Sequence, residues 1–394
     1  MYANFKKNST QVKNKELPAV VPKKYFKKWN EQKPYAELWM GTHPNGPSYL
    51  TAKNISLQDY IQQNAEILGS EVNKKFGLSL PFLFKILSIR KALSIQAHPD
   101  KDKAEELHLQ HPEIYKDSNH KPELTIALTP FEALCGFRPI KEIKEYLKLL
   151  PELRAVIGED IVNQFMMIDD SENTLLLKNC FYNLMTCDHN LVTLQLEHLL
   201  KRLSCLDQSS QQILNADLLR RLYLDYPGDV GCFGIYMFNY ITMQPGEALY
   251  LGPNEPHAYI YGDCVECMAC SDNVVRAGLT SKLKDIKTLT EILTYKCEPL
   301  LAKKFHGYCE DNYTEVFQPP VPDFAVAKIV IPSNKMNYEL IPRSTASILI
   351  TISGKAETDT SQILQKGSIL FIHANKKIDI LMLRAFSNRI ISGY

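Results

Sequence analysis

The sequence predicts a mainly β protein with an α-helical insertion. Short apolar runs bounded by turn residues, which are typical of strands, precede Pro139 and return after Cys232. Between these two regions, apolar side chains recur at helical spacing, as at Leu196, Leu199 and Leu203. A chain of 394 residues is also too long for one compact core. We therefore expect two copies of one β architecture, a sandwich or barrel, separated by helices.

The first β region follows a basic N-terminal segment. Residues 1–32 are rich in lysine, contain no arginine and show little periodicity, so we expect a divergent basic arm there. Residues 81–89 form an apolar run bounded by turn residues and predict a buried strand. Residues 100–120 are polar and predict an exposed loop or a short helix. We expect residues 33–139 and 231–290 to form one β domain.

The remaining segments predict helices first and short strands afterwards. Helices are expected at residues 140–150, 151–167, 175–185, 191–203 and 216–226, within an insertion domain of residues 140–230. Strands are expected at residues 234–238 and 248–251, followed by a helix at 284–296. The last expected strands are 325–331, 347–352, 368–372 and 378–383, in a second β domain of residues 291–394.

Composition excludes several classes of function. Lys and Arg total 45 against 44 Asp and Glu, which predicts no general affinity for nucleic acid or for an anionic membrane. No apolar run approaches the ~20 residues that span a bilayer, and the first residues lack the apolar stretch of a secretory signal. The ten cysteines are scattered along the chain. We therefore expect a cytoplasmic, reduced and monomeric protein.

Two polar segments alternate with apolar residues, as strands with one functional face would. Ser94, Gln96 and His98 share one face of a predicted strand and leave apolar neighbours on the other. Lys121 and Glu123 share a face in the same way, and a buried pair of this kind needs partners or a metal. The alternatives are a half-exposed edge strand for the first segment and a surface salt bridge for the second.

A third segment delivers a histidine to the start of a strand. The Pro-flanked turn at residues 253–256 leads directly into His257, and Tyr259 and Tyr261 share the face of His257. Taken alone, a histidine in this position is more often structural than a ligand.

Isolated charges mark a fourth segment, residues 263–282. Glu266, Asp272, Arg276 and Lys282 stand among apolar and small residues, where solvated loop charges are the alternative to a functional role. The same segment contains three cysteines, at positions 264, 267 and 270. We do not expect them to bind a metal, because in a strand the middle one faces away from the other two.

Four of these side chains make a plausible zinc shell. Gln96, His98, Glu123 and His257 would supply an amide oxygen, two imidazoles and a carboxylate, leaving a net charge of +1 at the metal. A position left open for water or substrate would make such a site catalytic rather than structural.

Together these segments resemble the type I phosphomannose isomerases. The matching motifs lie at residues 34–44, 94–101, 120–123, 131–139, 246–248, 256–259 and 262–282, and the resemblance covers residues 33–394. It implies a zinc enzyme with a cupin (jelly-roll) catalytic domain, a helical insertion and a second C-terminal jelly roll. It also implies one Zn²⁺ per chain on the four ligands named above, and Arg276 as a catalytic residue.

The implied reaction interconverts mannose 6-phosphate and fructose 6-phosphate and supplies mannose for glycosylation. It moves a proton between C1 and C2 through an enediol, so a base must lie within hydrogen-bond reach. Glu266, His120 and Lys121 are the candidates, and the sequence does not choose among them. For the sugar phosphate we expect contacts from the following side chains: Ser94, Lys121, Asp272 and Lys282.

Two other interpretations remain open. The family begins with an aromatic-x-Trp-Gly motif, whereas here Tyr25, Phe26 and Trp29 stand nearby without forming it. The chain could therefore be a catalytically impaired zinc-binding variant. Two histidines and one carboxylate also suit non-haem iron, so a cupin metalloenzyme such as an iron oxygenase is the third interpretation.

Overall fold

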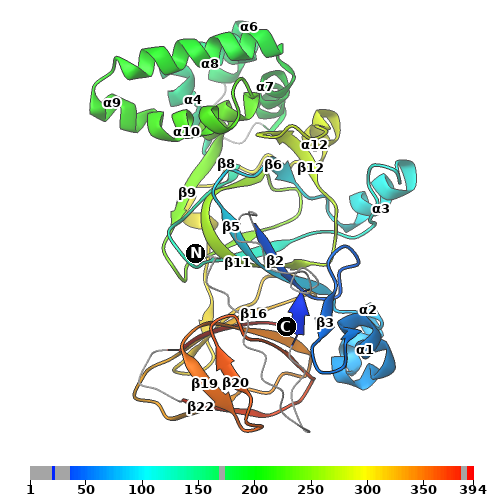
Figure 1. The fold of residues 1–394 in the computed structure, drawn as a ribbon. Helices are drawn as coiled ribbons and strands as arrows, with labels where there is room; N and C mark the ends of the chain where they lie inside the picture. Colours follow the sequence, from blue (N-terminus) through cyan, green and yellow to red (C-terminus); the bar gives the residue numbers. More distant parts are fainter. Residues whose placement is uncertain (1–19, 23–35, 168–173, 383–387) are drawn as a thin grey trace.

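The computed structural model describes residues 20–22, 36–167, 174–382 and 388–394. It is mainly β with one group of helices, as predicted. Figure 1 shows three bodies one above another, with helices at the top and a β body in the middle and at the bottom. We call them the helical unit (residues 140–225), the central β unit (residues 36–137 and 238–305) and the C-terminal β unit (residues 308–394).

Most of the predicted basic arm lies outside the described residues. Its described part forms strand β1 (Val20–Pro22), which pairs antiparallel with β3 (Ser48–Leu50), and β3 pairs with β4 (Ile55–Ser56). This small sheet lies beside three short helices: α1 (Leu57–Gln63), the 3-10 helix η3 (Ala65–Leu68) and α2 (Ser70–Phe76).

The central β unit is organised around one long strand. Its strands are β2 (Glu37–Met40), β5 (Phe82–Ile89), β6 (Ile95–Ala97), β7 (Glu123–Ala127), β8 (Phe131–Phe137), β9 (Phe238–Met243), β10 (Ala248–Leu251), β11 (His257–Ala269), β12 (Val275–Gly278) and β13 (Lys304–Phe305). The first half of β11 pairs with β6 and β8, and its second half pairs with β5 and β7. Residues far apart in the sequence are thereby brought onto neighbouring strands.

The predicted alternation along β7 is confirmed. Leu124 and Ile126 are buried in a hydrophobic core that the central and C-terminal β units share. Thr125 points the opposite way, into the central unit, where its hydroxyl lies 2.5 Å from the hydroxyl of Tyr259. Glu123 has the same parity as Thr125 and therefore lies on the interior face.

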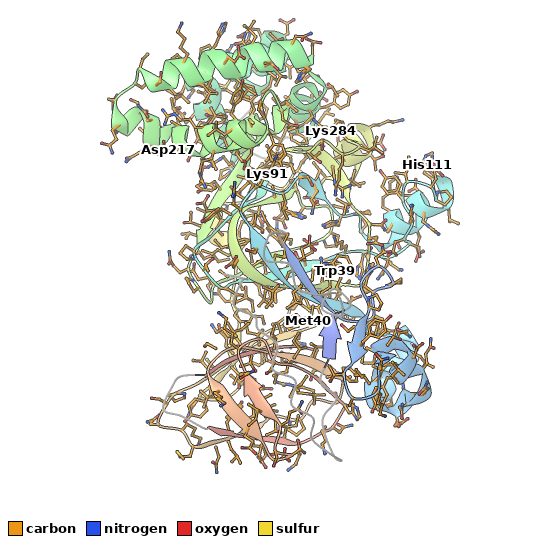
Figure 2. The ribbon with its side chains drawn as sticks, viewed as in Figure 1. Trp39, Met40, Lys91, His111, Asp217 and Lys284 are labelled. Atoms are coloured by element: carbon orange, nitrogen blue, oxygen red, sulfur yellow. The ribbon has the colours of Figure 1, made fainter. Side chains whose placement is uncertain are left out.

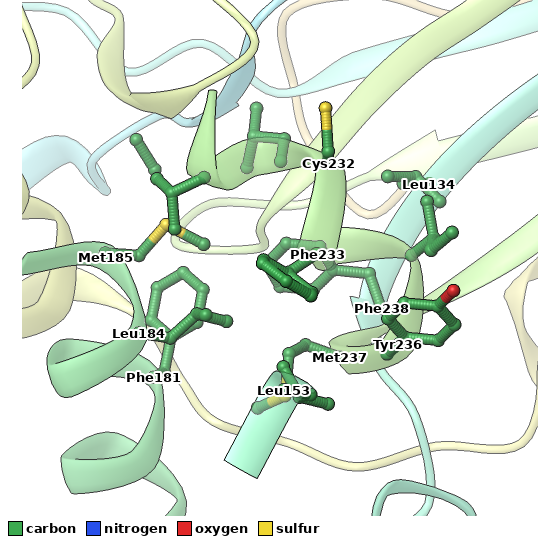
Figure 3. Close-up of a cluster of buried hydrophobic side chains, with 14 of the residues drawn as sticks. Leu134, Leu153, Phe181, Leu184, Met185, Cys232, Phe233, Tyr236, Met237 and Phe238 are labelled. Carbon is green, nitrogen blue, oxygen red and sulfur yellow. The ribbon is translucent and has the colours of Figure 1, made fainter. Parts of the chain in front are cut away.

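Seven helices build the helical unit within the described residues: α4 (Ile140–Leu149), α5 (Pro151–Ile157), α6 (Glu159–Met167), α7 (Thr174–Thr186), α8 (His189–Ser204), α9 (Gln208–Ile213) and α10 (Ala216–Asp225). Their apolar faces share one core with the adjoining edge of the central unit. Figure 3 shows Phe181 and Leu184 of α7 facing Phe233 and Phe238, which come from the segment that returns to the central unit. This packing fixes the helices against the β strands.

Two local predictions are wrong. The helix expected at residues 151–167 is two helices, because Gly158 adopts a φ of 99° and ends α5. The strand expected at residues 234–238 is the helical turn α11 (Gly234–Met237), preceded by the 3-10 helix η4 (Val230–Phe233), and β9 begins only at Phe238. That run is apolar and buried on all sides, so its periodicity does not separate strand from helix.

The C-terminal β unit contains two sheets. One has the order β14 (Tyr308–Cys309), β15 (Thr314–Phe317), β16 (Val326–Ile331), β23 (Asn388–Gly393), β18 (Ser347–Ser353) and β21 (Ile369–Ile372). The other has the order β17 (Asn337–Leu340), β22 (Ile378–Met382), β19 (Lys355–Thr358) and β20 (Ile363–Gln365). A separate hydrophobic core fills the unit.

The remaining helices connect these bodies. They are α3 (Lys101–Gln110), α12 (Ile286–Ile292) and the 3-10 helix η5 (Leu300–Lys303). Strand β13 pairs with β10, so the chain up to Phe305 still belongs to the central unit rather than to a C-terminal unit that starts at residue 291. None of the helices that the structure describes is long and apolar enough to cross a membrane.

Candidate metal centre

Three neighbouring strands bring the predicted ligands together. Gln96 lies on β6 directly opposite His257, the first residue of β11. Glu123, the first residue of β7, lies opposite the far end of the same strand β11. His98 follows β6 by one residue. Strands that all pair with β11 therefore carry residues from distant parts of the sequence into one site.

The atoms at the centre are close to one another and closed off from solvent. The Nε2 atom of His98 lies 3.3 Å from Oε1 of Glu123, and Nε2 of His257 lies 3.4 Å from Oε2 of the same carboxylate. The side chains of all three residues are at most 2% exposed. Within the described part of the chain, this is the one group of His, Cys, Asp and Glu side chains placed to hold a metal ion.

These separations fit a tetrahedral zinc ion. Ligand atoms bonded at about 2.1 Å to a tetrahedral centre lie roughly 3.4 Å apart. The Nε2 atom of His98 is buried and makes no hydrogen bond with any residue that the structure describes, although it lies beside a carboxylate oxygen. Two electron-pair donors that face each other in a buried site need a cation between them. The donor set therefore fits a divalent metal.

Both imidazoles are oriented by main-chain carbonyls. Nδ1 of His98 donates to the carbonyl oxygen of Asn273 at 2.5 Å, and Nδ1 of His257 donates to that of Glu255 at 3.0 Å. A neutral imidazole that donates from Nδ1 keeps a lone pair on Nε2. In both residues this lone pair is directed toward Glu123, as a metal ligand requires.

The protonation of the site also suits metal binding. Burial lowers the pKa of His98 to about 4, and the nearby Lys121 ammonium adds to this shift. Burial alone would raise the pKa of Glu123, but the neighbouring imidazole and the Lys121 ammonium hold it well below its usual range. At neutral pH the structure thus offers a neutral imidazole and an ionised carboxylate, the forms that bind metal.

Gln96 lies at the edge of this group. Its amide nitrogen is 3.5 Å from Nε2 of His257, while its amide oxygen accepts a hydrogen bond from the Ser94 hydroxyl at 3.0 Å. Because a hydroxyl can accept as well as donate, the reversed amide, with its oxygen toward His257, would also be satisfied. Ser94 therefore contacts the site through Gln96.

A buried ion pair lies next to the carboxylate, and sequence reasoning did not find its cationic member. Nζ of Lys85 on β5 is 2.9 Å from Oε2 of Glu266 on β11. Burial raises the pKa of Glu266, and the Glu123 carboxylate adds to the shift while the Lys85 ammonium opposes it. The signal for Lys85 was available, since it is the one charged residue in the predicted strand at residues 81–89.

An aromatic side chain covers this ion pair. Trp39 of β2 (Figure 2) lies opposite Lys85, with the ammonium 5.2 Å from the centre of its ring. The ring of His43 packs edge-on against Trp39 at 5.0 Å. His43 is in turn 3.2 Å from Asp272, so this predicted substrate contact belongs to the same wall. In the sequence, residues 34–44 were recognised only as a family motif, and no role was predicted for Trp39 or His43.

The other predicted residues occupy different surroundings. Lys121 is 3.3 Å from Glu123 and adjoins the metal group. Arg276 lies opposite Gln96 on β12, half-buried, and no residue in the described part of the chain forms an ion pair or a side-chain hydrogen bond with it. His120 points elsewhere, with Nε2 only 3.1 Å from the buried Asp323. Lys282 is exposed.

The cysteines do not form a metal cluster among the described residues. Cys264 and Cys267 are fully buried on opposite faces of β11, in two different hydrophobic cores. Burial raises the pKa of both thiols well above the usual value, which keeps them protonated. The expectation that these residues fill the core is confirmed for these two.

Comparisons with known proteins identify the family. The model of the phosphomannose isomerase type I catalytic domain matches residues 8–140, and that of the type I helical insertion domain matches residues 154–238. Mannose-6-phosphate isomerase of Rattus norvegicus is 47% identical over 364 residues, covering 89% of this chain and 86% of that protein. The Homo sapiens enzyme is 46% identical over 365 residues, covering 89% and 86%.

Solved structures agree in fold over nearly the whole chain. A crystal structure of mannose 6-phosphate isomerase bound with zinc and yttrium superposes with a TM-score of 0.80 at 29% identity, covering 96% of this chain and 99% of that one. The apo form of mannose 6-phosphate isomerase from Salmonella typhimurium gives a TM-score of 0.80 at 29% identity, covering 96% of this chain and 98% of that one. With sequence and fold in agreement, this chain belongs to the type I phosphomannose isomerase family.

Proposed function

We propose that this protein is a zinc-dependent isomerase that interconverts D-mannose 6-phosphate and D-fructose 6-phosphate. The observation that carries the proposal is the buried group of His98, Glu123 and His257, whose atomic separations suit tetrahedral zinc. It occurs in a chain that is 47% identical to a mannose-6-phosphate isomerase over most of its length.

We assign the metal to Gln96, His98, Glu123 and His257, with one Zn²⁺ per chain. When bound there, zinc supplies a Lewis acid that withdraws electrons from a substrate oxygen and favours loss of a proton from the adjacent carbon. Main-chain carbonyls hold the two imidazoles, and Lys121 and Tyr259 contact the carboxylate, before substrate arrives, so little reorganisation is needed.

Glu266 and Lys121 are the stronger candidates for proton transfer between C1 and C2. Glu266 is buried beside the metal group, and its raised pKa suits a carboxyl that takes up and returns a proton near neutral pH. Lys121 adjoins Glu123 and is also buried. His120 is a weaker candidate because its ring is hydrogen-bonded to Asp323.

The phosphate and hydroxyl groups of the sugar need polar contacts nearby. The Arg276 guanidinium forms no ion pair or side-chain hydrogen bond with any described residue. Such a planar group can hold an oxyanion through two hydrogen bonds. We assign it to the charge that develops on the substrate. We assign the phosphate and sugar hydroxyls to the remaining predicted contacts, which are Ser94, Lys121, Asp272 and Lys282.

The finer domain organisation is also a proposal. The pairing of β11 with strands on both sides, and the two sheets of the C-terminal unit, are compatible with two jelly rolls of the cupin type. We propose a cytoplasmic monomer in which residues 33–139 and 231–290 supply the catalytic domain and residues 140–230 the helical insertion. For the C-terminal jelly roll the proposed limits are residues 291–394, with the pairing of β13 favouring a start after Phe305.

The catalytically impaired alternative is not favoured. The catalytic-domain model matches from residue 8, so the N-terminal segment is also recognised as family-like. The residues that raised this alternative, Tyr25, Phe26 and Trp29, lie outside the described residues.

A turnover assay on mannose 6-phosphate, coupled to consumption of fructose 6-phosphate, tests the proposal on the chain as it stands. The metal content of protein purified without added metal is measured in parallel. One equivalent of zinc with turnover supports the proposal. Zinc without turnover would contradict the isomerase activity and revive the impaired variant. Iron together with oxygen consumption would contradict the zinc assignment.

A further inference from the structure

We propose that Asn273 is a positioning residue that aims His98 at the metal, an inference that rests on the zinc site proposed above. Asn273 lies in the segment between β11 and β12 and is only 2% exposed. Its main-chain carbonyl oxygen receives the Nδ1 proton of His98 at 2.5 Å. The direction of that carbonyl therefore determines where Nε2 of His98 points.

The side chain of Asn273 fixes that carbonyl by joining two loops. Its amide nitrogen donates one hydrogen bond to the carbonyl oxygen of Asp117 at 2.6 Å and another to that of Asn119 at 2.8 Å. Both acceptors lie in the loop that leads into β7, the strand that begins with Glu123. We call these two hydrogen bonds the clasp. The clasp joins the segment that orients His98 to the segment that leads to Glu123.

Further hydrogen bonds hold the clasp closed. The main-chain nitrogen of Asn273 donates to the Ser271 hydroxyl at 3.2 Å, and that hydroxyl donates to the carbonyl oxygen of Asn119 at 3.0 Å. The Asn119 amide returns a hydrogen bond to the carbonyl oxygen of Cys270 at 3.1 Å. The two loops are therefore linked from several sides, which leaves the Asn273 carbonyl little freedom.

The chemistry of the clasp requires an amide. Both partners of the Asn273 side chain are carbonyl oxygens, which only accept hydrogen bonds. An aspartate has the same shape but no donor when ionised, so it would place a charged oxygen against two others in a buried position. Asn273→Asp therefore removes the clasp while changing the side-chain volume very little.

Asn239 provides a matched control. It is also buried, at 1% exposed, and its amide nitrogen likewise bridges two main-chain carbonyls, those of Phe137 at 2.9 Å and Glu298 at 3.0 Å. Neither of these carbonyls receives a hydrogen bond from a metal-ligating histidine. Asn239→Asp thus reproduces the loss of a buried amide clasp without acting on the orientation of His98.

The test measures zinc affinity and the state of His98 separately. Zinc dissociation constants are measured by competition with a chromophoric chelator, and unfolding midpoints in urea are measured alongside. In metal-free protein with ¹⁵N-labelled histidine, NMR follows the Nδ1 proton of His98, which a hydrogen bond to a buried carbonyl should shift downfield and protect from exchange. A His98→Gln variant assigns that resonance.

We expect Asn273→Asp to weaken zinc binding by about 10- to 100-fold, as loss of a partner that orients a metal ligand does. It should also abolish the protected Nδ1 resonance. Asn239→Asp should lower the urea midpoint but keep both zinc affinity and the resonance. If Asn273→Asp does not fold, Ser271→Ala, which removes only the bridging hydroxyl, should shift zinc affinity in the same direction by less.

Two results would overturn the role of Asn273. One is unchanged zinc affinity in both Asn273→Asp and Ser271→Ala. The other is an equal loss of affinity in Asn273→Asp and Asn239→Asp, which would reflect general destabilisation. Wild-type protein that binds no zinc would instead overturn the proposed function, and the imidazole resonance would still decide whether Asn273 orients His98.

Discussion

The carboxylate of Glu123 is the group that the other side chains of the metal centre approach. His98, His257 and Lys121 approach its two oxygens to 3.3–3.4 Å, and the Tyr259 hydroxyl lies at 3.5 Å. The carboxylate is buried, so its charge is balanced by these protein groups rather than by solvent. Both imidazoles and the Lys121 ammonium thus meet at one carboxylate, which makes Glu123 the most informative residue to change.

Glu123→Gln should abolish turnover and strongly weaken zinc binding while leaving the protein folded. The amide keeps the shape of the side chain but removes the negative charge that compensates the metal, and it presents one oxygen and one NH2 group where the carboxylate presents two oxygens. Turnover, zinc content and far-UV circular dichroism check this together. His257→Ala should behave in the same way. Retention of both metal and full activity in Glu123→Gln would show that the ligand set is wrong.

For Cys267→Ser on β11 we expect the opposite result, namely that zinc binding is kept. The thiol faces the hydrophobic core shared by the two β units, on the far side of β11 from the metal group. The serine hydroxyl would be buried there without a planned partner and should cost about 1–3 kcal/mol of stability. Zinc content should stay at the wild-type value. A Cys267→Ser protein that folds but has lost its zinc would support the cysteine-cluster interpretation.

Lys85 and Glu266 should depend on each other for stability. Removing one partner of a buried ion pair leaves an uncompensated charge, so Lys85→Met should cost about 3–5 kcal/mol in urea unfolding at pH 7. The double variant Lys85→Met with Glu266→Gln should recover a large part of this loss, because both charges are then gone. Strictly additive effects of the two substitutions would argue against a direct pair.

Much of the metal centre follows from the sequence because strand parity sorts side chains by face. The alternation around Gln96 and Glu123 separated polar from apolar positions, and the structure confirms it. Lys85 was not predicted as a site residue, because the rest of its segment has the pattern of an ordinary buried strand. Its partner is 181 positions away, and such a pairing depends on strand register rather than on local pattern.

At the scale of single elements, the sequence predicts well where an exposed face or flanking turn residues mark the element. The amphipathic helix α8 and the strand β5 were predicted close to their observed bounds. The segment Gly234–Met237 was not, because it is buried on all sides and has no polar face to reveal its period. Gly158 is different, since a glycine within a helical pattern marks a C-terminal cap only in some contexts.

Helix α12 should show an acid-dependent stability that depends on its cap. The Asp285 carboxylate accepts hydrogen bonds from the Thr288 main chain and, at 2.6 Å, from the Tyr115 hydroxyl. Burial opposes ionisation, but these hydrogen bonds hold the pKa of Asp285 below its usual value. A lowered folded-state pKa means that the stabilisation is present above the ordinary pKa of about 3.9 and is lost as the pH falls through the folded pKa.

Asp285→Asn separates this acid dependence from capping itself. Asparagine is as good an N-cap residue as aspartate, so the helix should remain capped. The variant should be less stable than wild type in urea at pH 6, and the difference should shrink as the pH is lowered to 3. Asp285→Ala, which removes the cap altogether, should cost about 1 kcal/mol. A difference between Asp285→Asn and wild type that is constant from pH 6 to 3 would contradict the role of the carboxylate charge.

At the scale of the whole molecule, the metal centre depends on a unit that contributes no predicted ligand to it. The outer face of the central β unit, including Phe84 and Ile86, shares its core with Ile348 and Phe371 of the C-terminal β unit. Gly393 of β23 approaches so closely that a side chain there would meet the ring of Phe84 at 3.1 Å. Strand β7, which begins with Glu123, and the second half of β11 are thus backed on their far side by the C-terminal unit.

Phe371→Ala should therefore loosen the metal centre from a distance. Phe371 is fully buried in the shared core, and its truncation should cost about 3–5 kcal/mol. Urea unfolding is followed by far-UV circular dichroism and by zinc release to a chromophoric chelator. Both midpoints should fall together, because the strands of the central unit lose their support when the shared core opens.

Leu364→Ala is the matched comparison, since Leu364 is equally buried but belongs to the separate core of the C-terminal unit. Its truncation should cost about 2–5 kcal/mol and act on the zinc site only through that unit. For the same loss of stability, the zinc-release midpoint should fall less than in Phe371→Ala. A zinc-release midpoint that Phe371→Ala leaves unchanged, while the strand signal is lost at lower urea, would mean that the two β units unfold independently. In that case the metal centre would be held by the central unit alone.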